Sequence, residues 1–92
     1  WCLVEEGGKA RIGITDYAQQ ELGDIVYVEL PQLNDEVEQN DTIATVESVK
    51  SVANVYAPVG GKIVDINTEL ENSPDLINEY PYEDGWICVI EM

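Results

Sequence analysis

Residues 46–61 read VESVKSVANVYAPVGG, and one lysine in this stretch lies between two short strand-like runs. The runs Thr42–Glu47 and Val52–Ala57 are rich in Val, Ile, Thr and Tyr, residue types that favour strands. If the two runs pair as a hairpin, Lys50 lies at or beside the turn and its amine projects into water. Most exposed lysines only make a protein more soluble. This geometry also suits a lysine that an enzyme modifies, because the enzyme needs access and an attached cofactor needs room to move.

The rest of the chain shows the same alternation of short apolar segments and turn signals. Gly7–Gly8 and Gly60–Gly61 both predict tight hairpin turns in which the central residues have positive φ. Short strands separated by frequent turns predict a small all-β sandwich or barrel. The expected strands are Cys2–Glu5, Ala10–Ile14, Ile25–Glu29, Thr42–Glu47, Val52–Ala57, Lys62–Ile66 and Trp86–Ile90.

A first short helix is expected between Thr15 and Gly23. Thr15 can cap its N-terminus, Asp16 adds negative charge to the first turn, and Gly23 ends it. Ala18 and Leu22 are four residues apart, so we expect them to share its buried face.

A second short helix is expected after Ser73. Ser73 is the predicted cap and Pro74 the first helical residue. Leu76 and Ile77 would anchor this turn, and Pro81 would end it by moving the preceding residue out of helical geometry.

Charge and composition exclude several classes of function. The 92 residues include 19 acidic and 4 basic side chains, for a net charge of −15, and no histidine. Nucleic-acid binding through phosphate neutralisation is excluded, and stable binding to an anionic membrane is disfavoured. Catalytic triads and metal sites that use histidine are excluded too. No apolar run is long enough to span a membrane, so we expect a soluble monomer whose acidic surface meets partners with basic rims.

Cys2 and Cys88 lie near opposite ends of the chain. Two cysteines are too few for the disulfide framework of a small secreted protein. We therefore expect two reduced thiols, at least one of them in a strand that faces the core. The alternative is a single disulfide that joins the first strand to the last.

Four segments together resemble one known family. Residues 46–61 resemble the lipoyl-lysine region of the glycine cleavage system H proteins. Three other segments resemble the same family in the same order: residues 12–26 (IGITDYAQQELGDIV), 28–31 (VELP) and 78–86 (NEYPYEDGW). The resemblance implies a mostly β, lipoyl-domain-like barrel-sandwich hybrid of two antiparallel sheets with one or two short helices. Because family members usually extend further at both ends, we expect one lipoyl-carrier domain over residues 1–92, truncated or unobserved at each end.

The resemblance also implies a function. Lys50 would carry lipoate in amide linkage, within a recognition context of Glu47, Ser48, Val49 and Ser51. The protein would be a carrier rather than an enzyme, with the loaded arm folded against its surface. In the family, a pyridoxal-phosphate glycine decarboxylase loads an aminomethyl group onto the arm, an aminomethyltransferase passes the one-carbon unit to tetrahydrofolate, and a dihydrolipoyl dehydrogenase reoxidises the dithiol. Lipoate-attaching enzymes are further expected partners, in the bacterial cytoplasm (favoured) or the mitochondrial matrix.

Other non-catalytic functions remain open at this point. The nearest is an H-like lipoyl carrier that acts as a lipoate donor or sulfur-relay protein outside glycine cleavage. Another is an acidic binding module that has lost the cofactor. Lipoyl domains of 2-oxoacid dehydrogenases and biotin carriers usually show Asp-Lys-Ala and Met-Lys-Met at the hairpin, and neither tripeptide occurs here.

Enzyme and metal sites are disfavoured. A hydrolase that pairs Ser48 or Ser51 with Lys50 needs a lysine of lowered pKa, whereas an exposed lysine beside a glutamate keeps its charge. Residues 34–36 and 40–41 offer oxygen ligands but lack the spacing of a calcium loop, so they are predicted to form turns.

Overall fold

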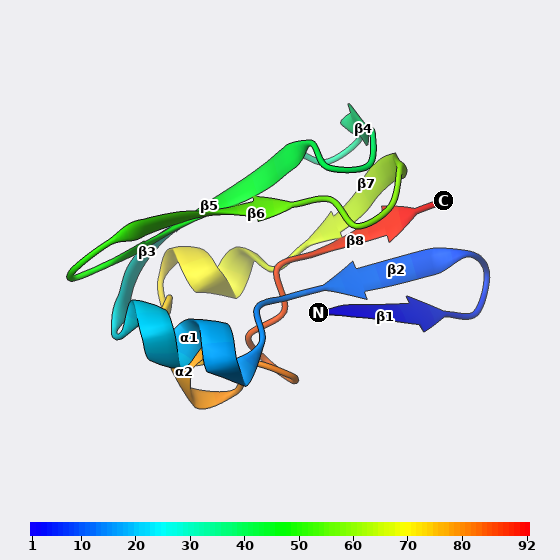
Figure 1. The fold of residues 1–92 in the computed structure, drawn as a ribbon. Coiled ribbons are helices and arrows are strands. Elements are labelled where there is room, and N and C mark those ends of the chain that lie inside the picture. The colour runs from blue at the N-terminus through cyan, green and yellow to red at the C-terminus, as the bar shows by residue number, and fades with distance from the viewer.

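A computed structural model describes all of residues 1–92 and contains two antiparallel sheets packed face to face (Figure 1). The five-stranded sheet has the order β1 (Cys2–Glu5), β2 (Lys9–Ile12), β8 (Cys88–Glu91), β7 (Gly61–Ile66) and β4 (Glu36–Val37). The three-stranded sheet has the order β3 (Ile25–Glu29), β5 (Thr42–Ser48) and β6 (Val52–Tyr56). This arrangement confirms the expected mostly β sandwich of two antiparallel sheets.

The first helix, α1 (Asp16–Leu22), forms where the sequence predicted it. The Thr15 hydroxyl accepts a 3.1 Å hydrogen bond from the Ala18 amide, as an N-cap residue should. Ala18 and Leu22 both pack against the core, as expected, but they are only half-buried because they also border a surface groove. The most buried residue of the helix is Gln19, which was not expected and which finds hydrogen-bond partners inside the protein.

The second helical region differs more from the prediction. A 3-10 turn, η1 (Thr68–Glu71), was not expected, and α2 (Leu76–Glu79) begins after Asp75 rather than at Pro74. The Ser73 side chain makes no capping bond; its backbone carbonyl accepts from the Leu76 amide at 3.1 Å instead. The prediction that a proline ends this helix is confirmed, since Tyr80 has φ −134° and ψ 62°, outside helical geometry.

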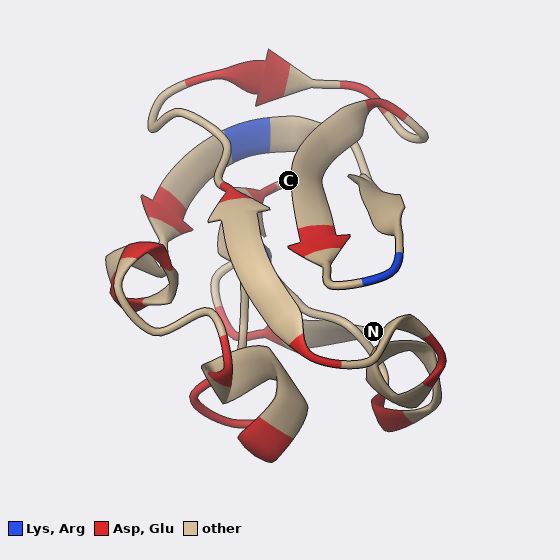
Figure 2. Ribbon diagram, turned by 90° about the vertical axis from the view of Figure 1, so that its left-hand side faces the viewer, with Lys and Arg blue, Asp and Glu red and all other residues tan.

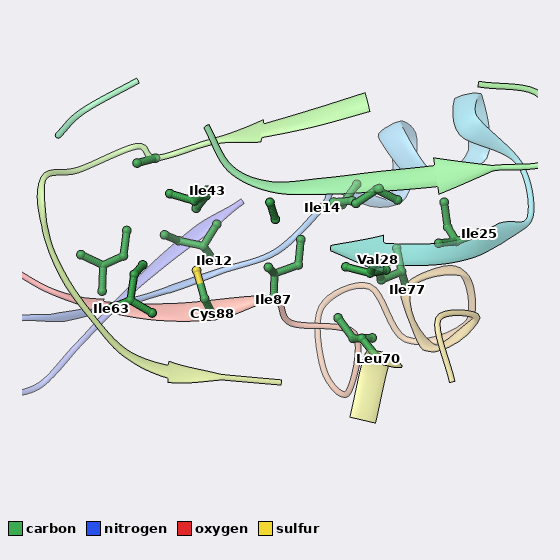
Figure 3. Close-up of a cluster of buried hydrophobic side chains, with 14 residues drawn as sticks. Ile12, Ile14, Ile25, Val28, Ile43, Ile63, Leu70, Ile77, Ile87 and Cys88 are labelled. Carbon is green, nitrogen blue, oxygen red and sulfur yellow. The ribbon is translucent and has the colours of Figure 1, made fainter. Parts of the chain in front are cut away.

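The core lies between the two sheets and is closed at one end by the helices (Figure 3). On β5 and β8 the inward side chains are fully buried, and each buried aliphatic side chain contributes about 1.5–3 kcal/mol. The core residues are Ile12, Ile14, Ile25, Val28, Ile43, Ala44, Val46, Ala57, Ile63, Leu70, Ile77, Ile87, Cys88 and Ile90.

The two glycine pairs turn out to have different roles. Gly7 and Gly8 have φ of 83° and 75° and form the predicted tight turn between β1 and β2. The predicted hairpin at Gly60–Gly61 is wrong, because β6 and β7 belong to different sheets and this segment carries the chain from one to the other. Gly61 serves close packing instead. A Cβ there would overlap the Glu91 carbonyl oxygen and lie 2.7 Å from the Ile90 Cγ2 atom.

Three features of the five-stranded sheet were also missed. The two-residue strand β4 was not expected, β2 ends at Ile12 rather than Ile14, and the last strand begins at Cys88 rather than Trp86. Asn34 and Asn40 have φ of 72° and 75°, which confirms the turns predicted at these two residues, whereas Glu36, also predicted to lie in a turn, belongs to β4.

The cysteines are not bridged. Cys2 is exposed on β1 and Cys88 is buried on β8, and both are free thiols. Strand β2 separates them, because Ile12 pairs with Cys2 on one side and with Cys88 on the other. The disulfide alternative is therefore wrong, and the expectation of a core-facing thiol is confirmed. Burial raises the pKa of Cys88 from 9.0 to about 12.

Candidate functional site

The tip of the β5–β6 hairpin projects at one end of the molecule and contains Lys50 (Figure 1). Glu47 pairs with Val52 at the end of the ladder, and the Ser48 amide donates to the Ser51 carbonyl at 2.8 Å. The Ser48 hydroxyl donates to the same carbonyl at 3.0 Å and accepts from the Ser51 amide at 3.0 Å. Ser48 therefore closes the turn, and its hydroxyl is not paired with the lysine amine as a hydrolase would require.

A second set of hydrogen bonds fastens this turn to the rest of the protein. The Val49 amide donates to the Asp24 carbonyl at 3.1 Å. On either side of Asp24, Asn78 accepts from the Ile25 amide at 2.8 Å and donates to the Gly23 carbonyl at 2.9 Å. The Lys50 turn is thus supported through residue 24 by a side chain far away in the sequence.

Asn78 itself is held in place by a buried neighbour. Its amide nitrogen also donates to Gln19 Oε1 at 2.9 Å, and Gln19 in turn donates to Asp16 at 2.8 Å. The role of Asn78 was not predicted from the sequence, although this residue lies in the segment 78–86 that resembles the family. No periodicity or spacing marks it, because its partners come together only in the fold.

Lys50 is exposed and forms no ion pair. Its side chain runs past Gly23, where an added Cβ would lie 3.4 Å from Lys50 Cε and 3.9 Å from Nζ. Val49 is 71% exposed, Ser51 is exposed, and Glu47 is half-buried. The structure therefore brings all five residues that the sequence singled out to one end of one hairpin, as expected for a turn.

A mostly apolar groove of about 310 Å³ lies between β6, α1 and the segment that leads into α1. It is close to the lysine, since Leu22 is the neighbour of Gly23 and Ala53 follows three residues after Lys50. Trp1 closes one side, with its indole nitrogen donating to the Pro81 carbonyl at 2.7 Å. The groove was missed by the sequence analysis, and its lining residues are Trp1, Gly13, Ile14, Thr15, Ala18, Leu22, Ala53, Asn54, Val55 and Tyr56.

Seen from the side of the molecule on which the hairpin tip lies, the ribbon contains many more acidic than basic residues (Figure 2). Of the 4 basic residues, Arg11 is paired with Glu5 at 3.2 Å and stacks on the Trp86 ring at 5.2 Å. No group of three or more Cys, Asp or Glu side chains is arranged to hold a metal ion. No helix is long and apolar enough to cross a membrane.

Comparisons with known proteins agree with this geometry. The sequence model of the family described as "Glycine cleavage H-protein" matches residues 1–92. The glycine cleavage system H protein of Halalkalibacterium halodurans is 57% identical over 91 residues, which cover 99% of this chain and 70% of the relative. That of Oceanobacillus iheyensis is 59% identical over 89 residues, covering 97% and 71%. The crystal structure of a glycine cleavage system H protein from Mycobacterium marinum superposes with a TM-score of 0.89 at 36% identity, over 97% of this chain and 69% of that one.

Proposed function

The chain belongs to the glycine cleavage H-protein family, and we propose that it is a non-catalytic carrier whose Lys50 holds lipoate in amide linkage. The observation that carries this proposal is the placement of Lys50. It is exposed, free of ion pairs, and fixed on a hydrogen-bonded hairpin turn at one end of the molecule. A rigid turn presents the same lysine in the same way to each enzyme that must reach it.

The residues beside Lys50 fit a long apolar arm. The groove begins next to the lysine and is lined mainly by apolar side chains. Ala53 and Tyr56 lie three and six residues along the chain from Lys50, or about 10 Å and 20 Å at the rise of a strand. We propose that this groove receives the arm between visits to enzymes, so that Ala18, Leu22 and Ala53 exclude water from its reactive end.

The roles of the hairpin residues follow from their contacts. Lipoate bound there would supply a disulfide of which one sulfur takes the aminomethyl carbon and the other becomes a thiol, with the electron pair coming from the bond that glycine breaks as it loses CO2. Ser48 keeps the turn closed, and Val49 ties it to residue 24 through its amide. Val49 and Ser51 are the exposed side chains on either side of Lys50, and Glu47 lies beside them at the end of the ladder.

The partners follow from the family and from charge. We propose that a glycine decarboxylase loads the arm, an aminomethyltransferase unloads it, and a dihydrolipoyl dehydrogenase reoxidises it. A net charge of −15 steers the carrier toward enzymes with basic rims and opposes its self-association, which favours a monomer. Both relatives are bacterial, and we place the carrier in the bacterial cytoplasm rather than the mitochondrial matrix. No finding favours a lipoate-donor or sulfur-relay role outside glycine cleavage.

The test is an intact mass with peptide mapping on protein from its native source. We expect a lipoyl adduct on the peptide that contains Lys50. In cells that make lipoate, Lys50→Arg should carry no adduct and unfold with a free energy within about 0.5 kcal/mol of the parent, while the control Lys62→Arg keeps the adduct. An unmodified Lys50 in such cells contradicts the carrier function. Incubating the lipoylated protein with glycine and glycine decarboxylase then separates glycine cleavage from the relay alternative, in which no loading occurs.

A further inference from the structure

We propose that the outward side of the three-stranded sheet, next to Lys50, is the surface on which the enzyme that loads the arm docks. We call this surface the docking face and define it by the exposed apolar residues Val26, Tyr27, Val49 and Val52 with the acidic residues Glu29 and Glu47. The partner that fits it presents an apolar patch edged by Lys or Arg. The inference rests on the proposed function, because it requires Lys50 to carry an arm that an enzyme loads.

A β-bulge gives the docking face two adjacent apolar side chains. Between the pairs Ile25–Ser48 and Tyr27–Glu47, β3 advances by two residues while β5 advances by one. Because of this extra residue, Val26 and Tyr27 are both exposed, at 52% and 51%, rather than alternating between core and solvent. Bulges of this kind are common beside functional sites, where they redirect a side chain.

The strand register makes these side chains neighbours. Tyr27 is paired with Glu47 on β5, and Glu47 is paired with Val52 on β6, so the three form one row across the sheet. Directly paired residues lie about 5 Å apart, which places Tyr27 and Val52 roughly 10 Å from each other with Glu47 between them. Val49 is in the turn beyond this row and is the most exposed of the group, at 71%.

The position of the docking face follows from the size of protein interfaces. An enzyme that acts on an arm attached at Lys50 must cover the hairpin tip. A stable interface takes about 800 Å² from each partner, a disc of roughly 16 Å radius. The area of such an interface is roughly one-seventh of this protein's 5328 Å² of solvent-accessible surface. A footprint of that size centred on the turn includes Tyr27 and Val52.

Charge specifies the chemistry of the partner. Glu29 and Glu47 are the charged side chains of this side of the sheet, and Glu29 pairs with Thr45 one row farther from the turn. Lys50 is the only basic residue between Arg11 and Lys62. An apolar centre bordered by carboxylates is complementary to an apolar patch bordered by basic groups. The opposite charges orient the two proteins as they meet and raise the association rate.

The experiment measures loading of the lipoylated protein by glycine decarboxylase at a series of carrier concentrations. Val52→Thr and Tyr27→Thr keep a good strand former and remove apolar surface. We expect the double variant to raise KM about tenfold with kcat within twofold of the parent, because binding rather than chemistry is weakened. Val4→Thr on β1 is the matched control: Val4 is 63% exposed against 60% for Val52, and its KM should not change.

Two further variants separate docking from a general loss of structure. Val52→Ile keeps the apolar surface and should keep the parent KM. Glu29→Gln should raise KM at low salt and reduce its dependence on salt. If the parent is loaded and the double variant has the same KM as Val4→Thr, the docking face is overturned while the carrier function stands. If the parent is not loaded at all, both the proposed function and this inference fail.

Discussion

Replacing Asn78 by alanine is the most informative test of how the Lys50 turn is supported. The asparagine is half-buried and makes three hydrogen bonds, to the Ile25 amide, the Gly23 carbonyl and Gln19 Oε1. Two of these partners belong to buried residues, since Ile25 is 4% exposed and Gln19 is 9% exposed. Alanine leaves all three groups without a protein partner.

The cost can be worked from these contacts. A buried polar group that loses its partner costs about 1–3 kcal/mol. The half-buried position of Asn78 lets water reach part of the site, so we take the lower value for each group and expect a loss of about 3 kcal/mol. For a chain of this size, that lowers Tm by at least about 12 °C. Asn78→Asp should be no better, because its carboxylate faces two acceptor oxygens.

The assay is equilibrium unfolding in urea, combined with hydrogen exchange at the Val49 amide. That amide is bonded to the carbonyl of residue 24, so its protection reports whether the turn has loosened. Asn72→Ala is the matched control, since Asn72 is exposed and its side chain makes no hydrogen bond; it should change stability by less than about 0.5 kcal/mol. If Asn78→Ala behaves like this control in both measurements, the proposed support of the turn is refuted.

Three other predictions concern packing, pH and salt. Gly61→Ala should lower the free energy of unfolding in urea by about 3 kcal/mol or more, because the added Cβ overlaps the Glu91 carbonyl oxygen. In the control Gly60→Ala the closest neighbour of the added Cβ is 3.4 Å away, so the loss should be less than about 1 kcal/mol. Equal losses would contradict the close packing of Gly61 against β8. Burial raises the pKa of Cys88 to about 12 from 9.0. The buried thiol should therefore contribute fully to the free energy of unfolding below pH 9, and this contribution should fall by about 1.4 kcal/mol per pH unit above it. Urea unfolding of the parent between pH 8 and 10.5 should show this slope, and Cys88→Ala should not show it. Loading by glycine decarboxylase should weaken as NaCl rises, because the protein is strongly acidic, and a KM independent of salt would count against electrostatic docking.

The hairpin that contains Lys50 was predictable because its strands and its turn are encoded by neighbouring residues. The runs on either side of the turn contain strand-forming residues, and Ser48 closes the turn with bonds to a residue three positions away. The N-cap of α1 was predictable for the same reason, since Thr15 bonds to Ala18. In both cases the bond that closes the turn joins residues only three positions apart.

The rest depends on partners that are distant in the sequence. Gly60–Gly61 has the composition of a hairpin turn, but β7 pairs with β8 and β4 in the other sheet rather than with β6, and nothing local distinguishes the two outcomes. Asn78 was invisible as a support of the site because its partners come from residues 19–25. The groove was missed likewise, since it combines the start of the chain, α1 and β6.

The order of strands in the larger sheet has a consequence for biosynthesis. β8 lies between β2 and β7, yet it is the last of these eight strands to be synthesised. Until it leaves the exit tunnel, the nascent chain has no central strand on which to assemble this sheet, and the apolar side of the Lys50 hairpin has no opposing sheet to cover it. An enzyme that recognises the hairpin in its folded form therefore acts only after synthesis of this segment is complete.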